Sequence, residues 1–283
     1  MDNSVFTVTP MNNSVSLDAG DIYEGDITVA NPANSTKDFY YKVEISSYGV
    51  IGEEYAADFL TESERSQIAK WITIDNPTGV IKPNDYVKVH YKVTVPESAP
   101  AGGQYAAFLV SSNLDANPDN SVLVSNVFEM ASILYAKING ELIHQGELID
   151  VSVPGFVVSP PIITSATLKN EGNIHEVARL GLEVRNYFSQ GSVYPKDGDT
   201  GMVDEVIMPG TTRIVTRNID GLSALGIYDV IQTVSYMGES KSVHQTVVVC
   251  PIWFMALLLV TFAAIIVSIV FSIKRHKKKR IVL

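Results

Sequence analysis

The chain has 283 residues, of which 46% are hydrophobic, so it can bury a core, is not expected to be disordered, and suits about two domains. Six of its 21 basic residues lie in residues 274–283, which leaves 15 basic against 31 acidic residues, a formal charge of −16, in residues 1–273. Such acidity excludes nucleic acid as a partner, because phosphates need a basic face.

The first half of the sequence is rich in short β patterns. Residues 86–95 alternate strictly between apolar and polar side chains, which is typical of a half-buried strand. Shorter β patterns cover 26–29, 39–45 and 105–110, with turn signals between them. One segment, residues 61–70, is predicted to be helical, with Thr61 as its cap and Glu64 three residues later.

The second half of the sequence repeats the first in outline. Three matches indicate this: Ile27–Asn31 with Ala166–Asn170, Val80–Pro83 with Val206–Pro209, and Gly103–Tyr105 with Gly226–Tyr228. We predict an all-β fold of two tandem immunoglobulin-like β-sandwich domains, residues 1–141 and 142–250, followed by a single C-terminal transmembrane α-helix. Tyr105 and Tyr228 are then corner tyrosines, whose hydroxyls bond the backbone while their rings pack in the core.

The first domain carries an insertion. Its Asn31 and Pro83 are 52 positions apart, whereas the matching Asn170 and Pro209 are 39 apart. The extra residues fall within 48–70, which contains several aromatic side chains among acidic ones.

Residues 252–273 are uncharged and long enough to cross the hydrocarbon layer of a bilayer. Aromatic residues at the start and basic residues after the end are the expected membrane-interface residues: Trp253, Phe254, Lys274, Arg275, Lys277, Lys278, Lys279 and Arg280. By the positive-inside rule the tail, 274–283, is cytoplasmic and residues 1–251 are outside. The sequence thus predicts a single-pass protein of the cell membrane.

An outside N-terminal part requires a signal peptide, and none is visible at Met1. We expect that it was removed or that the gene begins earlier, and the alternative is a tail-anchored protein with its bulk in the cytoplasm. The single cysteine, Cys250, allows no intramolecular disulfide and is expected to be a free thiol at the membrane edge.

Four segments resemble the N-terminal domain of WxL-interacting proteins, a family of Gram-positive cell-surface proteins. They are Phe6–Pro10, Tyr23–Pro32, Trp71–Ile74 and Pro100–Tyr105. The resemblance implies two β-sandwich domains, one C-terminal helix and a basic tail. It also implies peptidoglycan binding by the first domain, host binding by the second, and association with WxL-type surface proteins.

Catalytic signatures are absent from the sequence. It contains no G-x-S-x-G, P-loop or G-x-G-x-x-G pattern, and its five histidines lack ligand spacing. His90 is expected on the outer face of its strand. Two acidic loops, 115–121 and 197–205, are incomplete as calcium sites, and we expect both to be solvated. The chain is therefore predicted to be no enzyme and to need no cofactor, metal or disulfide.

The insertion is the best candidate for ligand contact, through Tyr48, Tyr55, Phe59 and Trp71, because aromatic faces stack on sugars or peptide side chains. The alternative is that Trp71 and Phe59 close the bottom of the first core. We expect a non-catalytic, membrane-anchored binding or adhesion protein whose partners are peptidoglycan or wall-associated surface proteins. The alternative is an assembly or accessory subunit that holds another surface protein, a transporter or an enzyme through a sheet edge.

Overall fold

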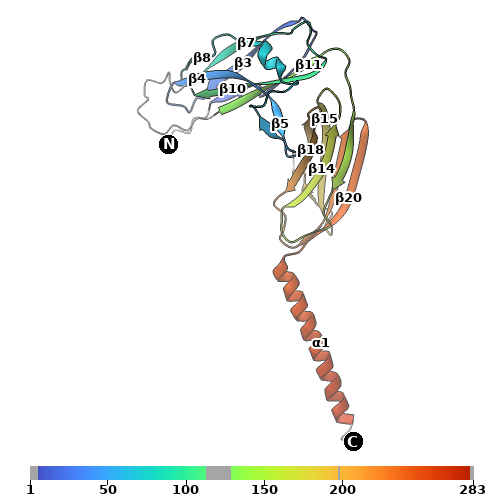
Figure 1. The fold of residues 1–283 in the computed structure, drawn as a ribbon. Helices are drawn as coiled ribbons and strands as arrows, with labels where there is room; N and C mark the ends of the chain where they lie inside the picture. The colour runs from blue at the N-terminus through green and yellow to red at the C-terminus, as the bar shows by residue number, and fades with distance from the viewer. Residues whose placement is uncertain (1–5, 113–128, 197, 281–283) are drawn as a thin grey trace. The chain divides into compact units, whose positions relative to one another are not determined.

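The computed structural model describes residues 6–112, 129–196 and 198–280, and consists mostly of β-strands with one long C-terminal helix (Figure 1). The chain divides into two compact units. The first comprises Met1–Glu147, Lys169–Glu176 and Val206–Arg213, and the second comprises Leu148–Leu168, Val177–Glu205 and Ile214–Leu283. The predicted boundary at residues 141 and 142 stays a prediction.

The first sandwich has two main sheets. One has four strands in the order β1 (Thr7–Thr9), β3 (Ile22–Asn31), β9 (Asp85–Thr94) and β7 (Ile72–Ile74). The other has five, in the order β2 (Asn12–Leu17), β11 (Glu129–Ile138), β10 (Gly102–Ser112), β4 (Phe39–Ser47) and β8 (Thr78–Ile81). A separate hairpin pairs β5 (Gly49–Ile51) with β6 (Ala56–Asp58).

The second sandwich repeats this plan. Its smaller sheet has the order β12 (Gly146–Ser152), β14 (Ile162–Asn170) and β18 (Thr212–Ile219). Its larger sheet has the order β13 (Phe156–Val157), β20 (Glu239–Val249), β19 (Gly226–Tyr236), β15 (Glu176–Asn186) and β16 (Ser192–Tyr194), with β17 (Met202–Ile207) also paired to β15.

The strand order is that of an immunoglobulin-like fold. In the first sandwich β1, β3, β9 and β7 correspond to strands A, B, E and D, and β4, β10 and β11 to strands C, F and G. In both sandwiches the first strand is split, and its second part, β2 or β13, runs parallel to the last strand. A proline lies at each break, Pro10 and Pro154, where its missing N–H cannot continue a ladder. The predicted fold class is confirmed.

The sequence repeat has a structural basis in two buried asparagines. Asn31 ends β3, and its Nδ2 donates to the carbonyls of Lys37 at 2.9 Å and Ile81 at 3.0 Å. Asn170 ends β14, and its Nδ2 donates to Ile174 at 2.8 Å and Ile207 at 2.9 Å. The matches of Asn31 with Asn170 and of Ile81 with Ile207 are therefore confirmed by equivalent bonds.

The two tyrosines differ from each other. Tyr228 belongs to the core of the second unit, and its hydroxyl accepts a hydrogen bond from the Ser223 N–H at 3.0 Å, as predicted for a corner tyrosine. Tyr105 is equally buried, but its hydroxyl accepts from the His175 N–H at 2.9 Å. Its ring is buried against Tyr135 and His175, on the face of β10 opposite to Ala106 and Phe108, so the predicted burial and backbone bond of Tyr105 are confirmed, but they lie on the outer side of its sheet.

The predicted strand at 86–95 is confirmed as β9, with Val89, Tyr91 and Val93 buried in the first core. Its outer face carries His90, whose Nδ1 lies 2.9 Å from Asp26 Oδ1 on β3. This hydrogen bond raises the pKa of His90.

The predicted helix at 61–70 is wrong in extent. Only Gln67–Trp71 are helical, as the short 3₁₀-helix η1. Ser63 and Ser66 form a turn instead, in which the Ser63 N–H donates to Ser66 Oγ at 2.8 Å, and such side-chain bonds compete with a helix. The Arg65 carbonyl accepts from the Tyr105 N–H at 2.7 Å, so this segment is held along β10.

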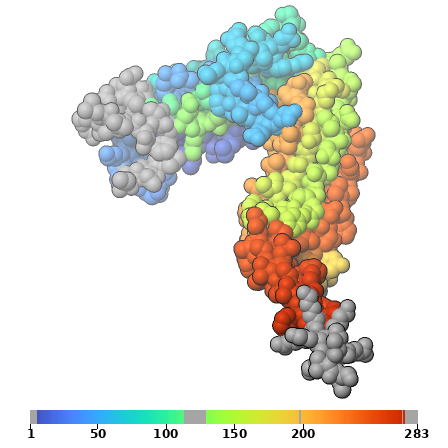
Figure 2. All heavy atoms as spheres, turned by 60° about the horizontal axis from the view of Figure 1, so that its bottom comes forward, coloured from blue at the N-terminus to red at the C-terminus, as the bar shows by residue number. Residues whose placement is uncertain are grey.

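The C-terminal helix α1 spans Ile252–Arg280 and follows β20 directly. Residues Ile252–Phe271 have a mean hydropathy of 2.9, and none of this stretch is buried against the rest of the described structure. Figure 2 is turned so that this end comes forward, and it shows the red atoms of α1 at the surface. One helix is thus long and apolar enough to cross a membrane. Cys250, just before it, is free and buried.

Candidate functional site

The insertion predicted from the Asn-to-Pro spacing leaves the first sandwich at the end of β4 and returns through η1 to β7. It contains the β5–β6 hairpin, whose turn uses Gly52 and Tyr55 at positive φ, 70° and 59°. The hairpin exposes large apolar side chains: Ile51 is 59% exposed and Leu60, just after β6, is 93% exposed. The extra residues thus form a separate hairpin outside the two main sheets, with Ile51 and Leu60 exposed.

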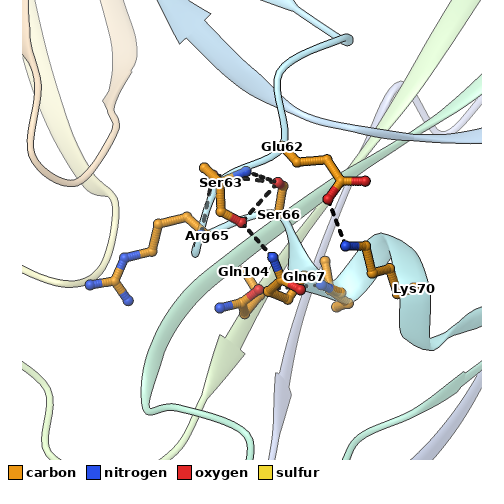
Figure 3. A network of polar contacts seen from close by, with 8 residues as sticks. Glu62, Ser63, Arg65, Ser66, Gln67, Lys70 and Gln104 are labelled. Carbon is orange, nitrogen blue, oxygen red and sulfur yellow. Dashed lines mark hydrogen bonds and ion pairs between the residues drawn. The ribbon is translucent and has the colours of Figure 1, made fainter.

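A buried amide fixes the return of the insertion (Figure 3). Gln104 on β10 is fully buried; its Nε2 donates to the Glu64 carbonyl at 2.8 Å, and its Oε1 accepts from the Ile68 N–H at 3.3 Å. Farther along, Lys70 Nζ lies 2.6 Å from Glu62 Oε2 at the surface. Gln104 therefore sets where the insertion rejoins the sandwich.

An aromatic cluster lies on the outer face of the five-stranded sheet, within the first unit. Tyr48, which follows β4, lies 5.9 Å from Phe59 and 6.0 Å from Tyr135, measured between ring centroids. Tyr135 on β11 faces Tyr105 at 5.7 Å and His175 at 5.2 Å. Five rings thus form a continuous chain, which we call the aromatic cluster.

The four predicted contact residues are only partly brought together. Tyr48 and Phe59 lie side by side in the aromatic cluster. Trp71 packs against the first core, as the alternative interpretation expected for it, whereas the ring of Phe59 lies tilted against Tyr48. The hydroxyl of Tyr55 bonds Thr211 and accepts from the Met208 N–H at 3.0 Å, so this side chain is engaged inside the first unit.

A shallow hollow of about 240 Å³ opens beside the aromatic cluster. Polar groups of Asp58, Ser63 and Arg65 lie with Tyr48 in its lining. Sequence reasoning placed Asp58 beside the candidate aromatic residues, but it missed Arg65 and also Tyr135, which has the pattern of an ordinary strand residue. The composition of residues 48–70 was a signal for the insertion that contains Arg65, whereas nothing in the sequence pattern of residues 129–138 pointed to Tyr135.

Burial and hydrogen bonding shift the pKa values of four groups in or beside the aromatic cluster. Burial raises the pKa of both Tyr105 and Tyr135, so their hydroxyls remain protonated. Burial lowers the pKa of His175, which favours the neutral imidazole. A hydrogen bond from the Thr61 side chain lowers the pKa of Asp58, which stays a carboxylate. The hollow therefore offers aromatic faces, one carboxylate and one guanidinium to a ligand.

The acidic loops are only partly described. The first, 115–121, and Asp197 of the second lie outside the described residues. In the second loop Asp204 forms a two-bond ion pair with Arg179, at 2.8 and 3.0 Å, and Asp199 accepts from the Gly201 N–H. Among the described residues, no group of three His, Cys, Asp or Glu side chains is placed to hold a metal ion.

The comparisons with known proteins concern the fold. No protein-family model and no curated protein matches the sequence. Among solved structures, the chain is similar to one from the CsuC–CsuE chaperone–tip adhesion subunit pre-assembly complex of Acinetobacter baumannii, at 13% identity over 86% of this chain and 98% of that one, TM-score 0.40.

Two further solved structures are similar over most of their length. The YadV chaperone is 11% identical over 88% of this chain and 100% of that one, TM-score 0.40. The E. coli chaperone DraB is 10% identical over 86% and 97%, TM-score 0.39.

Proposed function

We propose that the chain is a non-catalytic, membrane-anchored cell-surface protein whose first sandwich binds peptidoglycan or a wall-associated surface protein. The observation that supports the anchor is α1. Directly after the second sandwich it presents a stretch of 20 uncharged, predominantly apolar residues, Ile252–Phe271, which the rest of the described structure does not bury. Six basic residues follow this stretch, and by the positive-inside rule they support a location of the sandwiches outside the membrane.

The proposed contact surface is the β5–β6 hairpin together with Tyr48 and Phe59. Three features support it: the exposed Ile51 and Leu60, the paired aromatic rings, and the hollow beside them. Aromatic faces pack on sugar rings and on peptide side chains, and loops held by a rigid sandwich commonly carry specificity. The resemblance to WxL-interacting proteins supports the same surface partners. The acidic charge disfavours anionic wall polymers such as teichoic acid.

Sedimentation with purified peptidoglycan tests the proposal, using the full chain in detergent. We expect the wild type to pellet with peptidoglycan or to retain a wall-associated protein, and the double variant Tyr48→Ala with Phe59→Ala to lose this binding. Tyr86→Ala is the matched control, because Tyr86 is 62% exposed on β9, in the other sheet. A wild type that stays in the supernatant and retains no surface protein contradicts the function; a folded double variant that binds equally well contradicts the site.

A second candidate is a partner held by strand addition at β8. This strand is the outermost of its five-stranded sheet and exposes Val80 by 52%. Edge strands can pair with an extended segment of another chain. Val80→Lys should abolish binding in this case, because a charge on an edge strand blocks such pairing, and should leave binding unchanged if the hairpin is the site.

A further inference from the structure

Exposed apolar side chains gather at the end of the second unit from which α1 leaves. Phe156 is 49% exposed, Val158 45%, Tyr187 44%, Phe188 77% and Leu225 46%. They lie in three connecting loops, residues 153–161, 187–191 and 220–225, the first of which includes the two-residue strand β13. The only charged residue in these loops is Asp220. We call these five side chains the apolar rim. Their lack of charge contrasts with the acidic character of residues 1–273.

Strand pairing brings the three loops to one end. Phe156 is the register partner of Val248, and the Cys250 N–H donates to the Val157 carbonyl at 3.0 Å. Gly226, which follows the third loop, is the partner of Val249. The first residue of the second loop, Tyr187, donates its N–H to the Ile227 carbonyl at 3.0 Å. All three loops therefore neighbour the last residues of β20.

The loop that carries the most exposed ring is ordered by its own bonds. Asn186 Oδ1 accepts from the N–H groups of Phe188 and Ser189, both at 3.1 Å, and the Gln190 N–H donates to the Asn186 carbonyl at 2.8 Å. The rings of Tyr187 and Phe188 pack edge to face at 5.4 Å. The backbone thus holds Phe188 outward, although nothing within the described part of the unit covers most of its surface.

Only Cys250 and Pro251 separate the end of β20 from the start of α1. At no more than about 3.6 Å per residue, this connection spans at most about 11 Å. The headgroup layer is about 5–8 Å thick on each side of the hydrocarbon, and Trp253 marks its level at the start of the helix. If α1 crosses a bilayer, the loops at this end reach the headgroup layer.

We infer that the apolar rim is a second membrane contact, at which Phe156, Tyr187 and Phe188 insert into the outer interface of the bilayer beside α1. This inference rests on the proposed anchoring by α1. Aromatic side chains favour the interface, and these loops, with Asp220 as their single charged residue, meet less repulsion at an anionic surface than the acidic remainder of the chain does. The contact holds the second sandwich against the membrane and limits its tilting about the short connection.

Depth-dependent quenching tests the inference on the full chain in phosphatidylcholine vesicles that contain spin-labelled lipid. With Cys250 changed to Ser, one fluorophore is attached at Phe188→Cys, and in a separate variant at Phe156→Cys. The matched control is Lys241→Cys, an exposed site eight residues before Val249 on β20, about 27 Å from the membrane end. We expect lipids labelled near the headgroup to quench both rim sites several-fold more than the control.

The outcomes separate this inference from the anchoring. The chain could float with vesicles and resist alkaline extraction, yet be quenched at residue 188 no more than at residue 241. This result would overturn the rim contact and would still support anchoring by α1. A chain that does not float overturns both. Energy transfer between labelled copies, without lipid quenching, would mean that a second copy covers the rim and would also overturn the inference.

Discussion

Gln104 should be the side chain on which the position of the insertion depends most. Its amide bonds two backbone groups of the returning segment, the Glu64 carbonyl and the Ile68 N–H, and is itself fully buried (Figure 3). The change Gln104→Met keeps the length of the side chain and removes both bonds. Because Ile68 is also fully buried, its N–H then has no route to water.

The expected cost follows from these two bonds. Losing the bond to Glu64, whose carbonyl can turn to solvent, should cost about 1 kcal/mol. Leaving the Ile68 N–H buried without a partner should cost about 1–3 kcal/mol. We therefore expect the first unit to lose about 2–4 kcal/mol of unfolding free energy. Gln67→Met is the control, because the Gln67 Nε2 bond to the Ser63 carbonyl is exposed; it should cost less than about 1 kcal/mol.

The chain has two tryptophans, so urea unfolding followed by fluorescence in a Trp253→Phe background reports on Trp71, at the end of η1. Hydrogen exchange over residues 63–71 of the full chain in detergent should show the same order of effects. If Gln104→Met unfolds at the same urea concentration as Gln67→Met, the amide does not hold the insertion in place and the reasoning fails.

Five further substitutions have defined outcomes. Burial lowers the pKa of His175 from 6.5, so the stability that His175 contributes should be lost as pH falls below 6.5 towards the lowered pKa. The pKa of His90 is raised, so the stability that His90 contributes should be lost as pH rises through the raised pKa. Urea melts of the two His→Asn variants across pH should show these opposite signs. Asn170→Ala removes three hydrogen bonds to backbone groups and Asn31→Ala removes two, so thermal melts should show losses of about 3 and about 2 kcal/mol of unfolding free energy. An Asn170 variant as stable as the wild type would contradict the equivalence of Asn170 with Asn31. Tyr228→Phe should cost about 1 kcal/mol in the same melts through the bond to its upstream backbone, and a neutral result would contradict the corner assignment.

Local pattern and internal repetition predicted the fold well. The alternation in 86–95 corresponds to β9, because one face of that strand is buried and the other is solvated. The match of Asn31 with Asn170 succeeded for a different reason. The fold requires a buried amide that bonds two carbonyls at the end of β3 and at the end of β14, so both sandwiches have an asparagine there.

The candidate site was harder to predict, since it depends on contacts between distant positions. Tyr55 looked like a free aromatic residue, but its hydroxyl bonds the Met208 N–H, more than 150 positions away. Tyr135 and His175 join the aromatic cluster only through the fold. The helix expected at 61–70 failed because Ser63 and Ser66 bond the local backbone, a competition that helix periodicity does not reveal.

The most direct test of the account is protease accessibility on intact cells that express the chain. Protease added outside should remove both sandwiches and leave a protected fragment that consists of α1 and the basic tail. Complete protection of the sandwiches in intact cells, with cleavage only after the membrane is opened, would contradict a surface protein anchored by α1.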